Sequence, residues 1–155
     1  MPSFSTKRSV AFTAAQMYAV VADVARYPEF LPLCTGLTVL SRDTSPEGEA
    51  LKAQMSIGYK TIAESFTTRV ELRPADNRIN VSYLDGPFKR LNNRWRFIDL
   101  AEGKSEIDFY IDYEFRSAIL AVLMGAMFDS AFRKFSEAFE ARARKIYGTA
   151  VPAQR

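Results

Sequence analysis

Near its C-terminal end the chain reads Ser117-Ala-Ile-Leu-Ala-Val-Leu-Met-Gly-Ala-Met-Phe128, a run without a charged side chain. Beyond it, apolar residues recur at three- and four-residue steps as far as Ala143, with charged residues between them. This pattern predicts one helix over residues 117–147, about 45 Å long at about 1.5 Å per residue. A helix that is apolar on every side needs cover on every side, so we expect a sheet, a protein, a lipid or an apolar ligand over its first half.

The chain before this helix predicts mostly strands. Residues 3–12 indicate a first strand, and Thr13 and Gln16 then form the capping box of a short helix. A second short helical piece over residues 26–32 contains two prolines. Residues 37–115 alternate apolar and polar side chains between short turns, most clearly at 107–115. Short hairpin connections imply antiparallel pairing. We therefore predict an α+β fold, in which a curved antiparallel sheet of about six to seven strands wraps around the long C-terminal helix, with two short helices after the first strand.

The 155-residue length predicts one domain over residues 1–147 and a flexible tail over 148–155. There is no histidine, which excludes histidine metal sites and Ser-His or Cys-His nucleophile pairs. The one cysteine, Cys34, excludes an internal disulfide and fits a reducing compartment. No stretch resembles a signal peptide, and the uncharged run is shorter than the about 20 residues that span a bilayer. We expect a soluble, cytoplasmic protein.

The formal net charge of +3 lies entirely in residues 117–155, because the charges of residues 1–116 cancel. Two interpretations stay open for this basic surface. Cations near a helix C-terminus interact favourably with the helix dipole and keep an exposed face soluble. Alternatively, they attract anionic lipid headgroups or RNA, although so few charges do not indicate specific DNA binding. The side chains concerned are Arg133, Lys134, Arg142, Arg144 and Lys145.

Two motifs resemble those of a known family. They read Arg26-Tyr-Pro-Glu-Phe-Leu-Pro-Leu-Cys34 and Gly86-Pro-Phe-Lys-Arg-Leu-Asn-Asn-Arg-Trp-Arg-Phe97. Together with the order of elements, they resemble the coenzyme Q-binding branch of the START/polyketide cyclase superfamily, which has a helix-grip fold. The same branch includes a bacterial ribosome-association toxin. Leu33 departs from the family pattern, in which an aromatic residue commonly precedes the cysteine.

The resemblance implies an apolar cavity between sheet and helix that holds a polyisoprenoid quinone, ubiquinone, as a ligand rather than as a redox cofactor. The implied role is that of a quinone chaperone in respiration, with peripheral contact at the inner membrane. The alternative role, also implied by the branch, is association with the large ribosomal subunit that blocks subunit joining. For that role we expect the basic surface to provide the contact.

The residues themselves give a separate argument for a cavity, because Glu64 interrupts an otherwise apolar inward row in the strand at 60–73. A carboxylate in a filled core costs several kcal/mol unless it is paired. Either Glu64 has a cationic partner, the strand bulges, the interior is open and wet, or a one-residue change of register sends this side chain to solvent. The side chains that we expect to line the cavity are Glu64, Phe66, Tyr83, Asn93, Trp95, Tyr113, Leu120, Leu123, Met124, Met127 and Phe128.

Two apolar loops are candidates for the rim of the cavity. The first, with Tyr27, Pro28, Phe30 and Leu31, either guards an entrance and touches a membrane or closes one end of the core. The second, with Pro87 and Phe88, is either a rim element or a plain hairpin connection. A third function, catalysis by Glu64 with Tyr83 or Tyr113 as acid and base, has little support, since no nucleophile motif or metal site accompanies them. We therefore expect a protein that is not an enzyme.

Overall fold

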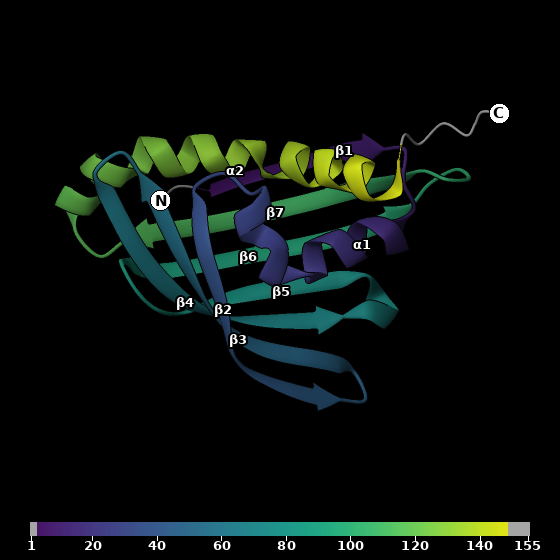
Figure 1. Ribbon diagram of the computed structural model, residues 1–155, viewed down its shortest axis with the longest axis horizontal. Helices are drawn as coiled ribbons and strands as arrows, with labels where there is room; N and C mark the ends of the chain where they lie inside the picture. The colour runs from purple at the N-terminus through teal and green to yellow at the C-terminus, as the bar shows by residue number, and fades with distance from the viewer. Residues whose placement is uncertain (1–2, 149–155) are drawn as a thin grey trace.

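The structure is a computed structural model that describes residues 3–148. Figure 1 shows the long helix lying across a broad sheet, with the shorter helices beside it. The elements follow in the order β1 (Ser3–Val10), α1 (Ala14–Ala22), η1 (Val24–Glu29), β2 (Cys34–Ser45), β3 (Gly48–Tyr59), β4 (Ile62–Arg73), η2 (Pro74–Asp76), β5 (Arg78–Asp85), β6 (Phe88–Asp99), β7 (Ser105–Phe115) and α2 (Ala118–Tyr147).

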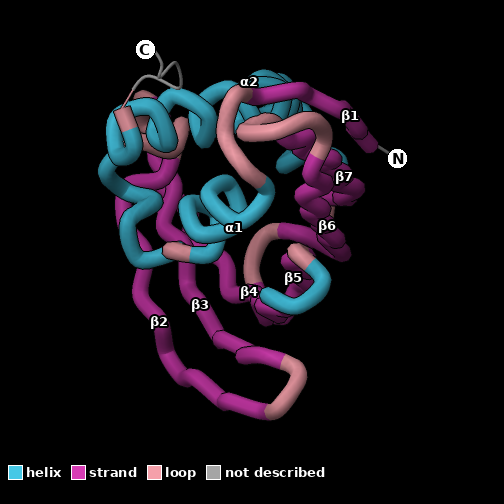
Figure 2. Tube along the Cα trace, turned by 90° about the vertical axis from the view of Figure 1, so that its right-hand side faces the viewer, coloured by secondary structure: helices cyan, strands magenta, loops and turns pink. Residues whose placement is uncertain are grey.

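Within the described residues the strands form one seven-stranded sheet in the order β1-β7-β6-β5-β4-β3-β2, and each neighbouring pair is antiparallel. Each strand from β2 to β6 therefore pairs with the next one along the chain, while β1 forms the far edge against β7. The sheet bends around the helices, as the view along its length shows (Figure 2). The predicted α+β helix-grip architecture is confirmed. Of the expected tail, residues 149–155 lie outside the described residues.

Local sequence explains the strands and the helix ends. The five apolar side chains of β7 are all buried and alternate with partly exposed polar ones, as the period of two predicts. At the start of α1, Thr13 Oγ1 accepts a hydrogen bond from the Gln16 amide at 3.1 Å, and Gln16 Oε1 accepts one from the Thr13 amide at 2.9 Å. The predicted capping box is therefore confirmed. Ser117 Oγ caps α2 by accepting from the Leu120 amide at 3.2 Å.

The two halves of α2 are covered differently. The second half buries a continuous stripe against the sheet and α1, which confirms its predicted amphipathic pattern; its members are Phe128, Ala131, Phe132, Phe139 and Ala143. Of residues 118–127, the first part of the helix, only Met124 is buried, and the opposite side of the helix faces outward. The expected cover of this outward side by a protein, a lipid or a ligand stays a prediction. The sheet covers one side of the helix, and no described element lies over the other.

Candidate functional site

A small cavity lies between the sheet and the second half of α2, with a volume of about 80 Å³. Its floor comes from β2 to β7, its roof from α2, and one end from η1 and the turn that follows. The wall is almost entirely apolar. The lining residues on the sheet side are Leu37, Ala53, Met55, Ile57, Phe66, Thr68, Val70, Val81, Leu91, Asn93, Trp95 and Ile111; the others are Val24, Tyr27, Leu31, Pro32, Leu33, Phe128, Ala131, Phe132, Phe135 and Phe139.

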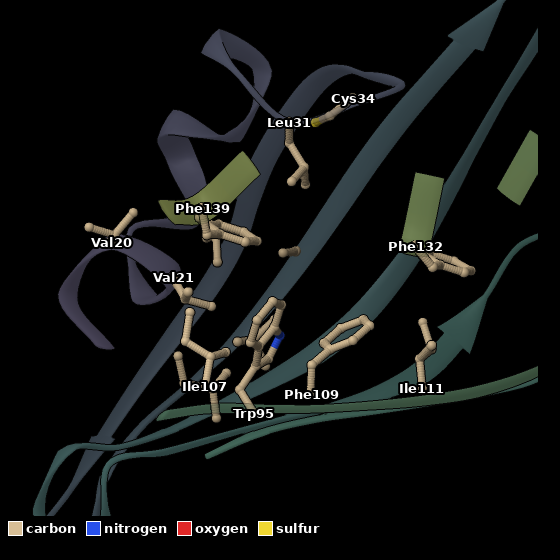
Figure 3. Packing of buried hydrophobic residues seen from close by; sticks show 14 of the residues in the cluster. Val20, Val21, Leu31, Cys34, Trp95, Ile107, Phe109, Ile111, Phe132 and Phe139 are labelled. Atoms are coloured by element: carbon tan, nitrogen blue, oxygen red, sulfur yellow. The ribbon is translucent and has the colours of Figure 1, made fainter. Parts of the chain in front are cut away.

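Aromatic rings from the helix meet aromatic rings from the sheet around this cavity. Figure 3 shows Phe132 and Phe139 of α2 pointing toward Trp95, Phe109 and Ile111 on the strands. The Trp95 ring lies edge-on to Phe139 with a centroid distance of 5.1 Å, and its centroid is 4.5 Å from that of Phe109. Both distances lie within the range of about 4.5 to 7 Å that aromatic pairs prefer.

The polar groups of the cavity wall are few and mostly occupied. Asn93 accepts a hydrogen bond from Trp95 Nε1 at 3.0 Å and donates one to the Tyr110 carbonyl at 2.9 Å. A carboxamide has two N–H donors, so Asn93 keeps one for a guest. Thr68 adds a buried hydroxyl to the same wall. The wall is therefore of a kind that suits an apolar molecule and could offer it one or two hydrogen bonds.

The loop after η1 closes one end of the cavity. Tyr27 and Phe30 each pack edge-on against Phe139 at 5.3 Å, and the Tyr27 hydroxyl donates to the Val21 carbonyl. Desolvation, assisted by the nearby Cys34 and Asp23, raises the pKa of Tyr27 far above its usual value, so it stays neutral. Of the two interpretations of this loop, the structure favours a closed end of the core over an open entrance.

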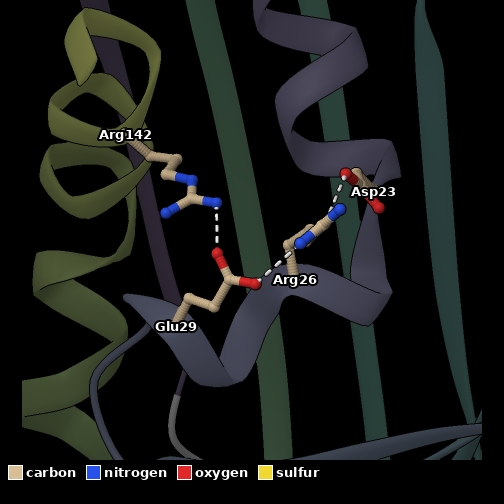
Figure 4. A network of polar contacts seen from close by, with 4 residues as sticks. All are labelled: Asp23, Arg26, Glu29 and Arg142. Atoms are coloured by element: carbon tan, nitrogen blue, oxygen red, sulfur yellow. Dashed lines mark hydrogen bonds and ion pairs between the residues drawn. The ribbon is translucent and has the colours of Figure 1, made fainter. Parts of the chain in front are cut away.

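Charged groups fasten this closed end to the long helix. Arg26 and Arg142 both contact Glu29, and Arg26 also lies near Asp23 (Figure 4). The hydrogen bond from Arg26, followed by that from Arg142, lowers the pKa of Glu29 below its usual 4.5. Residues 113 positions apart are thus joined, which links η1 to the last turns of α2.

Six of the residues expected at the site do line the cavity: Tyr27, Leu31, Phe66, Asn93, Trp95 and Phe128. Glu64 does not, and the expectation that it faces inward is wrong, because its side chain is exposed. The neighbouring strand explains this. The last residue of β5, Asp85, pairs with Thr67, so Glu64 lies where β4 has only β3 beside it. From Phe66 onward the inward set predicted for β4 is buried, although Thr67 is buried too, where the pairing with β5 shifts register.

A second group of expected residues lies in a filled aromatic cluster next to the cavity rather than on its wall. Phe88 is buried and its ring centroid is 5.4 Å from that of Phe128 and 4.9 Å from that of Phe115. The Tyr83 hydroxyl accepts from the Phe88 amide at 3.1 Å. The Pro87–Phe88 loop is therefore a packed connection and not a rim. The expected residues in this cluster are Tyr83, Phe88 and Tyr113, and Pro87 precedes Phe88 in the chain; Met124 is buried in the core and does not line the cavity.

The remaining expected residues lie near or at the surface. Leu120 is half-buried at the edge of the core. Leu123 and Met127 line a separate outer groove, and Leu123 is 60% exposed. Pro28 is exposed and Phe30 half-buried, and neither lines the cavity. Leu123 was expected inside because the uncharged run has no polar side chain to mark its outward face.

The basic surface is largely neutralised by acidic neighbours. Arg133 pairs with Asp129 at 3.0 Å, Arg144 with Glu140 at 3.6 Å, and Arg142 with Glu29. Lys134 and Lys145 are exposed and form no ion pair with another described residue. Three of the five cations are thus paired, and the role expected of this surface in ribosome contact stays a prediction.

Several wall residues were not expected, among them Leu33, Leu37, Ala53, Met55, Val81, Phe132, Phe135 and Phe139. The helical spacing of the three phenylalanines could have identified them, because they belong to the apolar stripe of the second half of α2. No sequence pattern marked Leu33 as a wall residue. It adopts φ = 70°, a left-handed conformation that a branched residue rarely takes, and its carbonyl accepts from the Gly58 amide at 3.0 Å.

None of the described helices is long and apolar enough to cross a membrane. Residues 10–140 match the family model described as "Polyketide cyclase / dehydrase and lipid transport". A solved START superfamily protein of Mycobacterium smegmatis has the same fold, with a TM-score of 0.78 over 93% of this chain and 98% of its own, at 19% identity.

Two kinds of named relative are similar along nearly the whole chain. The ribosome association toxin RatA of Escherichia coli is 35% identical over 147 residues, which cover 95% of this chain and 90% of the toxin. A mitochondrial coenzyme Q-binding protein homolog of Xenopus laevis is 29% identical over 149 residues, which cover 94% of this chain but 59% of that protein. The similarity to the toxin is higher and extends over more of the relative.

Proposed function

We propose that this chain, which belongs to the polyketide cyclase / dehydrase and lipid transport family, associates with the ribosome. The observation that carries the proposal is 35% identity with a ribosome association toxin over 95% of this chain and 90% of the toxin. Similarity of this extent leaves no large part of either protein without a counterpart in the other. The proposed outcome is that bound protein keeps the ribosomal subunits from joining.

Sucrose-gradient profiles test this proposal directly. Overproduction of the chain should lower the peak of joined ribosomes and raise the free subunits, and the purified protein should sediment with the large subunit. Because contacts with RNA phosphates release counterions, the association should weaken as salt rises. Unchanged profiles together with no sedimentation at low salt would overturn the proposal.

The unpaired lysines of α2 are the first contacts to examine. We expect the double substitution Lys134→Glu and Lys145→Glu to weaken the association, since these cations are exposed and free of ion pairs with the described residues. The matched control is Lys7→Glu with Lys104→Glu, which makes the same change of net charge on exposed residues of β1 and the β6–β7 turn. Equal loss in both variants would indicate a non-specific charge effect.

A second candidate function is binding of an apolar molecule, and the cavity favours it. The wall is apolar, Asn93 and Thr68 offer polar contacts, and one relative is named for coenzyme Q binding. The volume of the cavity limits what it can bind without rearrangement. An apolar cavity of about 150 Å³ holds benzene, so a hollow of about 80 Å³ must widen before it accepts a quinone ring. A guest would therefore have to displace part of the wall.

Mass spectrometry of organic extracts tests the second candidate. Protein purified without detergent should carry an isoprenoid quinone, and Ala131→Leu, which adds a side chain at the cavity wall, should reduce the amount retained. Ala141→Leu is the control, because Ala141 is exposed on the same helix. Extracts without any apolar molecule, combined with no uptake of added quinone, would contradict ligand binding.

We also propose that the chain is not an enzyme. The candidate base Glu64 is exposed, whereas Tyr113 is buried and the Tyr83 hydroxyl is hydrogen-bonded to the backbone. Burial raises the pKa of both tyrosines, which makes them weaker acids at neutral pH. These observations support a binding role.

A further inference from the structure

Three arginines face one another across neighbouring strands on the outer side of the sheet. In the strand register, Arg73 of β4 lies opposite Arg78 of β5, which in turn lies opposite Arg96 of β6. On each strand the adjoining residue is buried in the core, so the arginines point away from the helices. Figure 2 shows α1 and α2 inside the curve of the sheet, so the row of arginines lies on its outer face.

This row of cations is poorly compensated by the rest of the described chain. Side chains directly opposite each other on antiparallel strands have Cβ atoms about 4.5 to 5.5 Å apart, and like charges in such pairs destabilise a sheet. Arg73 and Arg78 form no ion pair with another described residue, and Arg96 reaches Asp108 only at 3.8 Å. Phosphate groups placed between the guanidinium groups would remove the repulsion. The row is therefore complementary to a partner that carries phosphates.

An open hollow of about 830 Å³ adjoins the row, over the outer side of β5, β6 and β7. Arg78 and Arg96 line it, so the row and the hollow form one surface. Asn80, directly opposite Arg94 in the register, also lines the hollow, and its side chain forms no hydrogen bond with another described residue. A carboxamide offers two donors and an acceptor oxygen, which are the groups that read the edges of bases.

Arg94 and Tyr110 form a stacked pair within the hollow. The guanidinium carbon of Arg94 lies 4.4 Å from the centroid of the Tyr110 ring. The Tyr110 hydroxyl donates to Asp112 Oδ2 at 2.8 Å, and Asp112 Oδ1 accepts from Arg90 Nε at 3.1 Å, which holds the ring in place. Arg94 is exposed and forms no ion pair with another described residue. Guanidinium planes and aromatic rings are the surfaces on which proteins stack the bases of unpaired RNA.

The hollow also contains carboxylates, but each of them has an arginine beside it. The pairs are Asp112 with Arg90 at 3.1 Å, Glu71 with Arg69 at 3.2 Å and Asp108 with Arg96 at 3.8 Å. Arg78 and Arg94 are not among the ion pairs of the described residues, so their charges remain available. We call this surface the arginine face; its members are Arg73, Arg78, Asn80, Arg94, Arg96 and Tyr110.

We propose that the arginine face binds single-stranded RNA. The row of arginines holds successive phosphates, a base stacks on Arg94 and Tyr110, and the Asn80 side chain hydrogen-bonds to the edge of a base. The inference rests on the proposed ribosome association, for which it specifies the partner as an unpaired segment of ribosomal RNA and the contact as the outer face of the sheet.

The chemistry of the arginine face favours a single strand over other anionic partners. In a duplex the bases stack on one another, which leaves no base for Arg94 and Tyr110 to contact. None of the members is aliphatic, so the face has no side chain suited to entering a bilayer. An acidic protein would pair with the arginines alone and leave the stacked pair unused.

Fluorescence anisotropy with a labelled RNA single strand of about 12 nucleotides tests the proposal, since single-strand-binding domains cover about 4 to 16 nucleotides. The wild type should bind this strand more tightly than it binds the same strand in a duplex. Tyr110→Val, which removes the ring and keeps a side chain that favours strands, should weaken binding about tenfold. Arg94→Lys should also weaken binding but leave its salt dependence unchanged, since the charge stays and the guanidinium plane is lost.

A double substitution tests the phosphate contacts. Arg78→Gln with Arg94→Gln should reduce the steepness of log affinity against log salt concentration by about 1.4, at about 0.7 for each phosphate contact with a single strand. The matched control is Lys104→Gln with Arg116→Gln, which makes the same change of net charge at exposed residues outside the hollow. Circular dichroism before each assay verifies that the variants are folded.

Sedimentation with ribosomes separates this inference from the proposed function. Lys134 and Lys145 lie on α2, and neither they nor Lys7, the control in that assay, line the hollow. Wild-type sedimentation that the arginine double variant fully retains would overturn the inference and leave ribosome association standing. No wild-type sedimentation, together with strand binding that depends on Arg78 and Arg94, would overturn ribosome association and support the RNA-binding face.

Three results of the anisotropy assay would overturn the proposal. The first is no binding of the single strand by the wild type. The second is equal affinity for the single strand and the duplex. The third is unchanged affinity in Tyr110→Val together with equal displacement of the strand by inorganic polyphosphate of the same charge, which would indicate a general attraction of anions.

Discussion

Gly86 lies directly against Phe66, and its φ of +141° is one that residues with a Cβ rarely adopt. A Cβ built there would be 2.5 Å from the Phe66 Cβ and 2.9 Å from its Cα. Neither atom can move without shifting β4. Because Phe66 lines the cavity and Gly86 precedes the buried Phe88, this close approach positions both aromatic clusters.

We expect Gly86→Ala to lower the free energy of unfolding by about 2 to 4 kcal/mol, from backbone strain together with the clash. Urea titration measures the change. Gly103→Ala is the control, since Gly103 also has a positive φ of +74° but no atom within 4 Å of an added Cβ. It should cost about 1 kcal/mol. Equal losses in the two variants would show that the contact with Phe66 does not matter.

At the scale of elements, α2 contains one residue that weakens it. Gly125 lies in the middle of the helix, and nothing lies within 4 Å of an ideal Cβ at that position. The glycine is therefore not required for close approach of the sheet. We expect Gly125→Ala to stabilise the protein by about 1 kcal/mol, through helix propensity alone. Thermal unfolding would show this as a higher Tm, and a lower Tm would indicate a packing role.

The link between η1 and α2 should depend on pH. Because Arg26 and Arg142 lower the pKa of Glu29 in the folded state, folding favours its ionised form. This stabilisation is present above the unfolded pKa near 4.5 and is lost as the pH falls through the lowered folded pKa. We expect Glu29→Gln to flatten the acid side of the curve of stability against pH.

Urea unfolding at a series of pH values between about 3 and 7 measures this dependence. Glu102→Gln, in the exposed β6–β7 turn, is the control and should leave the curve unchanged. Parallel curves for Glu29→Gln and the wild type would show that the contacts with the two arginines do not contribute.

At the scale of the whole molecule, the cavity predicts that a bound guest stabilises the fold. A ligand at about 100 times its Kd adds about 2.7 kcal/mol to the free energy of unfolding. For a protein of this size that corresponds to a rise in Tm of about 5 to 10 °C, at about 2 to 4 °C per kcal/mol. We expect a short-chain ubiquinone to produce such a rise, measured by calorimetry.

The variant Ala131→Leu should show a smaller rise than the wild type, because the added side chain occupies space at the cavity wall. Ala141→Leu should respond as the wild type does. An equal rise in all three proteins would place the ligand outside this cavity.

The cavity and the lysines proposed for ribosome association lie in different parts of the molecule. The cavity lies inside, between sheet and helix, whereas Lys134 and Lys145 are exposed on the surface. A single fold can therefore carry both functions without conflict. The tests above use different readouts, so each function can be accepted or rejected separately.

Local periodicity was enough to predict the architecture. Alternation in β7, the stripe on the second half of α2 and the capping side chains of Thr13 and Gln16 are each set by the backbone geometry of a few neighbouring residues. These patterns need no knowledge of distant contacts. They also placed Phe66, Asn93, Trp95 and Phe128 on the inner face, and the structure locates all four on the cavity wall.

Only the tertiary structure decided where that inner face ends and which charges are free. Glu64 follows the inward alternation but is exposed because β5 stops before reaching it. Val122 is exposed because the sheet covers one side of α2 alone. Arg142 is neutralised by Glu29, 113 residues away. A sequence pattern indicates which side chains share one face of a helix or strand. Burial and ion pairing depend on how far the neighbouring elements extend, and only the folded chain determines that.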